Sequence, residues 1–261
     1  MIKAIASDLD GTLLLHGAQA LNPEIYDIIL ELKKMGISFI SASGRQLASQ
    51  HNLFAPIVNE ISYIAENGAV CLHNGETIVA SGIDRELGLR IANEVTKRPG
   101  CKVVISGIEA CYMLSGDDAF FYHVSQEMNN VTVAVDSFED IQEPFLKICY
   151  YDEDDIIASS KHFQELFEKD MKVITSGNVW VDFLPYDCNK AVALKILLDK
   201  MNILPEEVIS FGDQQNDVEM LTMTGKSYAM AGAVPEAKAC ADEITDSVEK
   251  TLRELIKNLE K

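Results

Sequence analysis

The chain has 261 residues, of which 48% are hydrophobic and 24% are charged, and this composition is typical of a folded globular protein. Its formal net charge of −19 argues against nucleic acid as a partner, because a phosphate backbone requires a basic protein surface. No apolar run reaches the roughly 18 residues that a membrane-spanning helix needs, and the aspartate at position 8 is atypical of a signal peptide. We therefore expect a cytoplasmic protein that has no membrane partner.

The first third of the chain alternates between strand and helix patterns. Its apolar runs are short and continuous, as in strands buried on both faces, and Asn22-Pro23 is typical of a helix start. Gly36 is placed to end that helix. Strands joined by helices in this way predict a parallel sheet covered on both faces. The expected elements are strands at 2–7 and 37–43, a strand that ends within 63–67, and helices from Pro23 to Lys34 and from Arg45 to about Phe54.

The pattern changes in the middle of the chain. Asn74-Gly75 stands between two short apolar runs of residues 69–81, which predicts a β-hairpin. Beyond the hairpin, paired strands separated by helices predict an α+β module with a largely antiparallel sheet. The expected elements are helices at 84–97, 117–128 and 154–169, and strands at 101–106, 110–115, 131–135, 145–151, 171–175 and 178–184.

The strand–helix alternation returns from Lys190 onward. The predicted fold class is therefore α/β. We expect a Rossmann-like parallel-sheet core formed by residues 1–82 and 187–261, interrupted by an inserted α+β domain at residues 83–186. The expected elements of the last part are helices at 190–201, at about 217–223 and at roughly 247–260, and strands at 207–213 and 227–232.

Two carboxylates, Asp8 and Asp10, follow the first expected strand, at the sheet edge where open α/β folds bind ligands. Like charges about 4 Å apart repel by about 4 kcal/mol at an effective dielectric of about 20. A hard divalent cation with oxygen ligands, such as Mg²⁺, removes that cost, and Gly11 allows a tight backbone turn beside it. Taken alone, the motif is equally consistent with a solvated turn or a helix cap.

A second acidic strand end follows the expected strand at 207–213. Asp213 closes this strand, and Asn216 and Asp217 come directly behind it. Further acidic ligands at a neighbouring strand end are what a shared metal site needs. By itself the segment favours an ordinary strand-to-helix turn with Asp217 near the helix start, but two acidic strand ends in one sheet favour a metal site.

Two other segments carry groups that suit an anion. Ser43, Gly44 and Arg45 end a strand and open a helix, so that a hydroxyl, a glycine amide and a helix N-terminus together offer a phosphate cradle. Lys190 opens a helix, where the helix dipole disfavours a cation, and this placement suggests that it holds phosphate and balances the carboxylates. Each segment alone has a simpler interpretation, as a plain N-cap serine or a surface lysine.

In this order and at these strand ends, the motifs resemble those of the haloacid dehalogenase superfamily. DLDGT (8–12) resembles its first motif, Ser43 its second, Lys190 its third and GDQQND (212–217) its fourth. Together with ENGA (66–69), the set is similar to the Cof-type phosphatases. The resemblance implies a magnesium-dependent phosphatase, and the long interval between the second and third motifs implies that the inserted domain is an α+β cap.

The resemblance also implies a role for each residue. Asp8 would attack phosphorus and form an aspartyl-phosphate, while Asp10 would act as general acid and then as general base. Mg²⁺ would be held by Asp8, Asp213 and the backbone carbonyl of Asp10, with Asn216 and Asp217 supporting the metal and the lysine from behind. The residues expected to contact phosphate or substrate are Thr12, which would also orient the nucleophile loop, Ser43, Gly44, Arg45, Asn67, Lys190 and Asn216.

Two positions leave alternatives open. Asn67 ends a core strand, and a turn asparagine before Gly68 is the alternative to a substrate contact. Relatives often carry an asparagine-alanine pair after the last core strand, where this chain has Gly232-Ala233, and we expect this departure to alter one contact on the substrate side.

Hydrolysis of a small phosphorylated metabolite, with a sugar phosphate as one candidate, is the function that the motifs favour. The alternative is phosphoryl transfer of the phosphomutase type, which shares the first motif and the position of the cap. A mutase that rebinds a bisphosphate needs extra cations in the cap, whereas those at residues 83–186 are few and dispersed. A sensor without catalysis is disfavoured because Asp8, Asp10, Ser43, Lys190 and Asp213 are all present.

Overall fold

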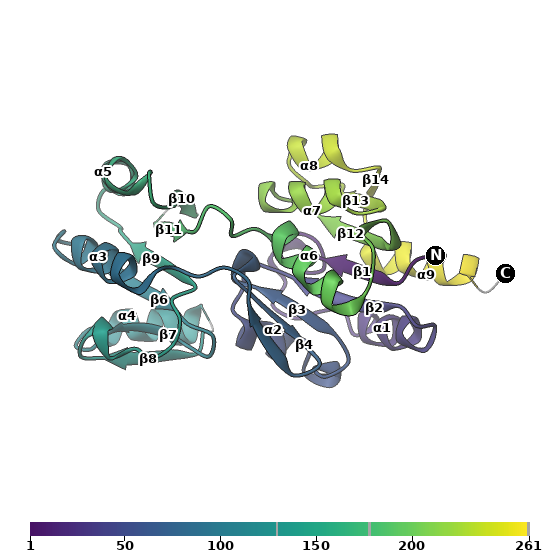
Figure 1. Cartoon of the computed structure of the whole chain (residues 1–261), viewed down its shortest axis with the longest axis horizontal. Helices are drawn as coiled ribbons and strands as arrows, with labels where there is room; N and C mark the ends of the chain where they lie inside the picture. Colours follow the sequence, from purple (N-terminus) through teal and green to yellow (C-terminus); the bar gives the residue numbers. More distant parts are fainter. Residues whose placement is uncertain (129, 177–178, 260–261) are drawn as a thin grey trace. The chain divides into compact units, whose positions relative to one another are not determined.

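The computed structural model describes residues 1–128, 130–176 and 179–259 (Figure 1). The chain forms two compact units. The first contains Met1–Arg45, Gln50–Ala80 and the part of the chain from Asn189 onward, and the second contains Gln46–Ser49 and Ser81–Cys188. Within the described residues, no helix combines the length and the apolar character that crossing a membrane requires.

The first unit is built on an eight-stranded sheet in the order β14-β13-β12-β1-β2-β3-β4-β5. From β14 to β3 every neighbouring pair is parallel, and β4 and β5 are added antiparallel. The predicted turn at Asn74-Gly75 joins β4 to β5, and both residues have the positive φ that such a two-residue turn requires. The strands are β1 (Ala4–Ser7), β2 (Ser38–Ala42), β3 (Ser62–Ala65), β4 (Val70–His73), β5 (Glu76–Val79), β12 (Val208–Gly212), β13 (Lys226–Met230) and β14 (Glu243–Thr245).

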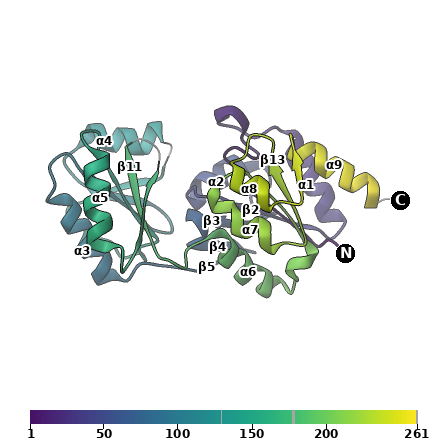
Figure 2. The same ribbon diagram turned by 90° about the horizontal axis from the view of Figure 1, so that it is seen from above.

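Helices cover the parallel part of this sheet. The helix α1 buries an apolar stripe with helical spacing against β2 and lies beside α9 (Figure 2). On the other side, α6 and α7 pack on a face that includes Ala4, Ala6 and Ile40. The α/β fold class expected from the sequence is therefore confirmed. The helices associated with this sheet are α1 (Glu24–Lys34), α2 (Leu47–Leu53), α6 (Lys190–Met201), α7 (Val218–Met223), α8 (Pro235–Cys240) and α9 (Val248–Leu259).

The second unit contains a six-stranded sheet in the order β10-β11-β9-β6-β7-β8. Its pairs are antiparallel except for β7 and β8, which are parallel. The strands are β6 (Lys102–Ser106), β7 (Cys111–Leu114), β8 (Thr132–Val135), β9 (Lys147–Tyr151), β10 (Lys172–Ser176) and β11 (Trp180–Leu184). The first residue of the strand expected at 178–184, and the last residue of the helix expected at 247–260, lie outside the described residues.

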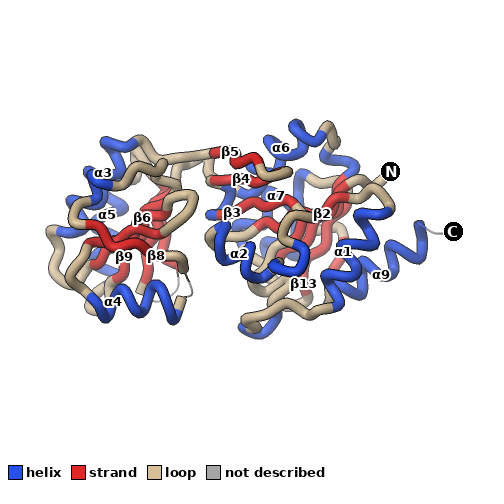
Figure 3. Tube along the Cα trace, turned by 90° about the horizontal axis from the view of Figure 1, so that it is seen from below, coloured by secondary structure: helices blue, strands red, loops and turns tan. Residues whose placement is uncertain are grey.

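Three helices complete the second unit. In Figure 3, α3 and α5 lie on one side of the strands of this sheet and α4 lies on the other. Residues of α3 and α5 share one apolar core with a face of the sheet, and α4 contributes Phe120 to a separate cluster with Val104 and Met113. Each of these helices begins at an aspartate whose side chain accepts a backbone N–H of the first turn. They are α3 (Arg85–Thr96), α4 (Asp118–Tyr122), which continues as a π-helical turn (His123–Glu127), and α5 (Ile156–Phe167).

Two elements near the C-terminal end were not predicted. The strand β14 has only three residues, of which Glu243 and Ile244 are exposed, so it shows no readable apolar pattern. The helix α8 begins with Pro235, a start signal that the sequence does carry. Single 3₁₀ turns occupy Leu15–Gly17, Ala55–Ile57, Glu66–Gly68, Phe138–Asp140, Pro205–Glu207 and Gln215–Asp217.

Candidate active site

The candidate site begins in the turn that follows β1. Asp8 is 5% exposed, whereas the side chain of Asp10 is 55% exposed. Gly11 has a φ of +85°, and a Cβ there would lie 2.2 Å from Oδ2 of Asp213. Only glycine therefore lets this turn lie against the end of β12, and the close approach brings together the two acidic strand ends that the sequence predicted.

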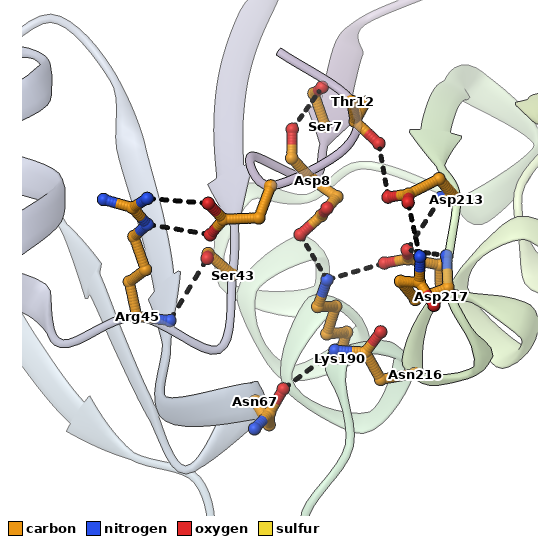
Figure 4. Close-up of polar contacts among 12 residues, drawn as sticks. Ser7, Asp8, Thr12, Ser43, Arg45, Asn67, Lys190, Asp213, Asn216 and Asp217 are labelled. Atoms are coloured by element: carbon orange, nitrogen blue, oxygen red, sulfur yellow. Dashed lines mark hydrogen bonds and ion pairs between the residues drawn. The ribbon is translucent and has the colours of Figure 1, made fainter. Parts of the chain in front are cut away.

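A buried lysine links these strand ends. Lys190 is fully buried, and its Nζ donates to Oδ1 of Asp8 and to Oδ1 of Asp217, both at 2.6 Å (Figure 4). It stands in the first turn of α6, which begins where the side chain of Asn189 accepts the N–H of Val192. The unfavourable helix-end position noted in the sequence is thus offset by two carboxylates within hydrogen-bond distance.

The two acidic residues after β12 make different contacts. Oδ2 of Asp217 accepts the backbone N–H groups of Asp213 at 2.9 Å and Gln214 at 3.0 Å. Together with the bond to the lysine, these contacts engage both oxygens of Asp217. Asp213 accepts the Thr12 hydroxyl at 3.0 Å and the Gln214 amide at 2.7 Å. Thr12, expected to contact phosphate, therefore bonds a carboxylate, and the sequence analysis missed the contribution of Gln214.

The site contains more acidic than basic side chains. Burial raises the pKa of Asp8 to about 8, an effect that the ammonium of Lys190 opposes only in part. Burial also raises the pKa of Asp213. Although burial by itself would lower the pKa of Lys190, the carboxylates of Asp8 and Asp217 raise it, so the lysine is charged. One ammonium thus faces three carboxyl groups, and a bound cation would favour their ionised form.

The donor set suits a hard divalent cation. Asp8, Asp213 and Asp217 each offer a carboxylate oxygen, and these oxygens lie within 4.8 Å of one another. Oxygen ligands and excess negative charge are what Mg²⁺ selects. The carboxylate of Asp217 accepts three hydrogen bonds from the protein, one of them from the ammonium of Lys190. Asp213 accepts two, from Thr12 and Gln214, and Asp8 accepts one from Lys190. Asp8 and Asp213 therefore keep more acceptor capacity for a metal.

The end of β2 brings a hydroxyl and a guanidinium to the same edge of the sheet. Ser43 is buried, and its Oγ accepts the backbone N–H of Arg45 at 3.1 Å. The guanidinium of Arg45 points to Asp10, with Nε 2.7 Å from Oδ2 and Nη2 2.6 Å from Oδ1. This two-point ion pair was not predicted from the sequence, because nothing in the local pattern indicates which group the arginine contacts.

The turn after β3 joins two of the motifs. Glu66 and Asn67 have φ values of 50° and 58°. This left-handed conformation is uncommon for a glutamate, is adopted more readily by asparagine, and occurs often at functional sites. The Asn67 side chain accepts the Asn216 amide at 2.9 Å, and its backbone N–H donates to the Ser43 carbonyl at 3.1 Å. In this unit, the structure therefore brings together the predicted residues from four strand ends and the start of α6.

A buried glutamine that the sequence analysis missed also supports this edge. Gln50 accepts the hydroxyl of Ser41 at 2.7 Å and donates to the carbonyl of Ile64 at 3.0 Å, which ties β2 to β3. Its sequence position in a helix gives no signal of this role. At Gly232, which follows β13, a Cβ would meet no atom within 4 Å, so the described neighbours leave room for a side chain at this position.

Known proteins are similar to this chain over nearly its whole length. A profile of the haloacid dehalogenase-like hydrolases matches residues 5–251. The chain belongs to this family. The 5-amino-6-(5-phospho-D-ribitylamino)uracil phosphatase YbjI of Escherichia coli is 28% identical over 262 residues, which cover 97% of each chain. The HMP-PP phosphatase of Citrobacter koseri is 25% identical over 246 residues, covering 90% of this chain and 86% of its own.

Solved structures agree with this assignment. A crystal structure of a protein from Eubacterium rectale has a TM-score of 0.88 and 28% identity, covering 97% of this chain and 99% of its own. The structure of TM0651 from Thermotoga maritima has a TM-score of 0.87 and 25% identity, with 97% of each chain covered. The haloacid dehalogenase fold and the phosphatase class that the motifs predicted are therefore confirmed.

Proposed function

We propose that this protein is a magnesium-dependent phosphatase that hydrolyses a small phosphorylated metabolite through an aspartyl-phosphate on Asp8. The observation that carries the proposal is the buried contact of Lys190 with Asp8 at 2.6 Å, beside the carboxylate of Asp213. A buried carboxylate held by a lysine, next to a second carboxylate, suits a nucleophile that works with a metal and a phosphoryl group.

The reaction follows from the groups at this edge of the sheet. A carboxylate oxygen of Asp8 forms a bond to phosphorus as the bond to the leaving oxygen breaks, and Asp10 gives the leaving oxygen a proton. Asp10 then takes a proton from a water molecule that attacks the phosphorus of the acyl phosphate. Inorganic phosphate leaves, and both aspartates return to their starting states.

The metal and phosphate contacts are part of the same proposal. Asp8, Asp213 and the backbone carbonyl of Asp10 would hold Mg²⁺, which supplies positive charge to the phosphoryl oxygens when bound. Thr12 and Asp217 would orient the ligand side chains, in agreement with their contacts to Asp213 and Lys190. The groups that would contact the phosphate or the rest of the substrate are Ser43, Gly44, Arg45, Asn67, Lys190 and Asn216.

The division into core and cap and the class of substrate are part of the same proposal. We propose that residues 83–186 form the cap and that residues 1–82 and 187–261 form the core, in a cytoplasmic enzyme. The relatives described above carry phosphatase names, which supports hydrolysis over the phosphomutase alternative. Their named substrates are small phosphorylated molecules, and a sugar phosphate is one candidate for this chain.

Phosphate release from a panel of phosphorylated metabolites tests the proposal. Wild type with Mg²⁺ is expected to release phosphate from at least one of them, EDTA to stop the reaction and added Mg²⁺ to restore it. Asp8→Asn is expected to be inactive and folded. The matched control is Asp199→Asn, an exposed aspartate near the other end of α6, which should keep wild-type activity. Full activity of Asp8→Asn would exclude the aspartyl-phosphate.

A further inference from the structure

The ion pair between Arg45 and Asp10 has a geometry that the proposed phosphate contact of Arg45 does not explain. Two N–H groups of the guanidinium meet both oxygens of one carboxylate, at 2.7 and 2.6 Å. Such a two-point contact fixes the plane of the carboxylate as well as its position. Two of the five N–H donors of an arginine are used in this way, so the contact is compatible with a further bond to a substrate oxygen.

The arginine is the more firmly held member of the pair. Its backbone N–H donates to Ser43 Oγ at 3.1 Å, and its carbonyl accepts the Glu66 N–H at 3.1 Å and the Gln50 amide at 3.4 Å. Its side chain is 24% exposed, whereas that of Asp10 is 55% exposed. The more exposed carboxylate is therefore oriented by an arginine that is anchored to the ends of β2 and β3.

Orientation matters for a group that transfers a proton. A general acid must come within hydrogen-bond distance of the atom that receives the proton, and an exposed aspartate samples several staggered rotamers. Most exposed ion pairs add only about 0.2–1 kcal/mol to stability. We therefore expect this pair to affect the rate of the reaction more than the stability of the fold.

We propose that Arg45 is a positioning residue for Asp10, which holds the carboxylate in the orientation from which it serves the leaving oxygen. This inference rests on the proposed function. Its consequence depends on the leaving group: an alkyl phosphate needs a proton on the departing oxygen, whereas a nitrophenyl phosphate leaves as a stable anion. In the step that forms the aspartyl-phosphate, loss of the orientation slows the alkyl ester more than the nitrophenyl ester, while loss of a phosphate contact slows both alike. The hydrolysis that follows, with Asp10 as base, is the same for both substrates.

The test compares Arg45→Gln and Arg45→Lys with wild type, using glycerol phosphate and p-nitrophenyl phosphate with saturating Mg²⁺. Both variants are expected to lose about tenfold or more in the single-turnover rate of leaving-group release from the alkyl phosphate, a part of the roughly 10²-fold effect of a general acid, and to lose less in the same rate on the aryl phosphate. Lysine keeps the charge but lacks the two-point geometry. Equal losses of this rate on both substrates, or no loss on either, would overturn the proposal.

Two controls separate the possible causes. In a double variant with Asp10→Ala, Arg45→Gln should cost clearly less than it costs in wild type, because residues that act through one another are not additive; fully additive losses would contradict the inference. Arg90→Gln removes an exposed arginine–aspartate pair of 2.7 Å in the second unit and should leave kcat on both substrates unchanged. A wild type without any magnesium-dependent phosphate release would instead refute the proposed function.

A structural readout does not depend on activity. In a crystal structure of Arg45→Gln, the Asp10 side chain is expected to leave the orientation seen here or to occupy more than one. An unchanged single orientation would show that the turn alone holds Asp10 and would overturn the positioning role.

Discussion

Lys190 and Asp217 form a fully buried ion pair of 2.6 Å between the first turn of α6 and the loop after β12. The same carboxylate accepts two backbone N–H groups of that loop. One side chain thus neutralises part of the lysine charge and sets the course of the segment that carries Asp213. Both the stability of the fold and the position of the site residues therefore depend on Asp217.

Asp217→Ala should therefore destabilise the protein strongly. It leaves a buried ammonium with one carboxylate fewer and leaves the N–H groups of Asp213 and Gln214 without their acceptor. Removing one partner of a buried ion pair costs about 3–5 kcal/mol. Urea unfolding monitored by circular dichroism measures the loss. Asp199→Ala, an exposed position of the same helix, should change the free energy of unfolding by less than about 0.5 kcal/mol; equal effects would argue against the buried network.

Gly11→Ala should reduce both stability and activity. A side chain at a φ of +85° is strained, and the added Cβ would lie 2.2 Å from Asp213. We expect a loss of more than about 1 kcal/mol and weaker Mg²⁺ binding. Gly232→Asn is the comparison, since nothing lies within 4 Å of a Cβ at that position, and it should stay within about 0.5 kcal/mol of wild type. Thermal melting without Mg²⁺ measures the loss of stability, and the change in melting temperature on adding Mg²⁺ measures the weaker binding.

The stability of the metal-free protein should fall as the pH rises. Burial raises the pKa of Asp8 from 3.8 to about 8, so between these values the unfolded chain has released a proton that the folded chain keeps. Ionisation of Asp8 therefore favours the unfolded state increasingly from about pH 4 to pH 8. Mg²⁺ favours the ionised carboxylate, so its stabilising effect should grow over the same range.

Melting curves in EDTA and in Mg²⁺ at several pH values test this behaviour. Asp8→Asn is the control, because asparagine does not titrate. In EDTA, the stability of wild type relative to Asp8→Asn should decrease as the pH rises. A difference between the two proteins that stays constant from pH 5 to pH 8 would contradict the raised pKa of Asp8.

Asn67 and Asn216 should contribute to substrate binding as a pair. Asn216 donates to Asn67 at 2.9 Å, and Asn67 has a φ of 58°, so Asn67→Gly removes the side chain without adding backbone strain. Asn67→Gly and Asn216→Ala are each expected to raise KM several-fold, and the double variant to add little to either. Steady-state kinetics measures this, and fully additive effects would show that the two asparagines act separately.

Local patterns were enough to predict much of the fold. Continuous apolar runs identified β1 and β12, and the end of the helix α1 at Lys34 was predicted correctly. Asn74-Gly75 marked the hairpin between β4 and β5. These features depend on neighbours within a few residues, through the helical period, the strand period and the φ values that turns require. The three-residue β14 is too short to show such a period and forms because β13 offers it a parallel partner.

Which side chains contact one another was decided by the tertiary structure. The sequence pointed to Asp8, Ser43, Lys190 and Asp213 as site residues because each of them follows a predicted strand or opens a predicted helix. That Thr12 bonds Asp213, 201 residues away, and that Arg45 bonds Asp10, depends on strand order and on the close approach of Gly11 to β12. Such contacts join segments distant in the sequence, and no local propensity encodes the partner, since the sheet alone brings β2 and β12 to either side of β1.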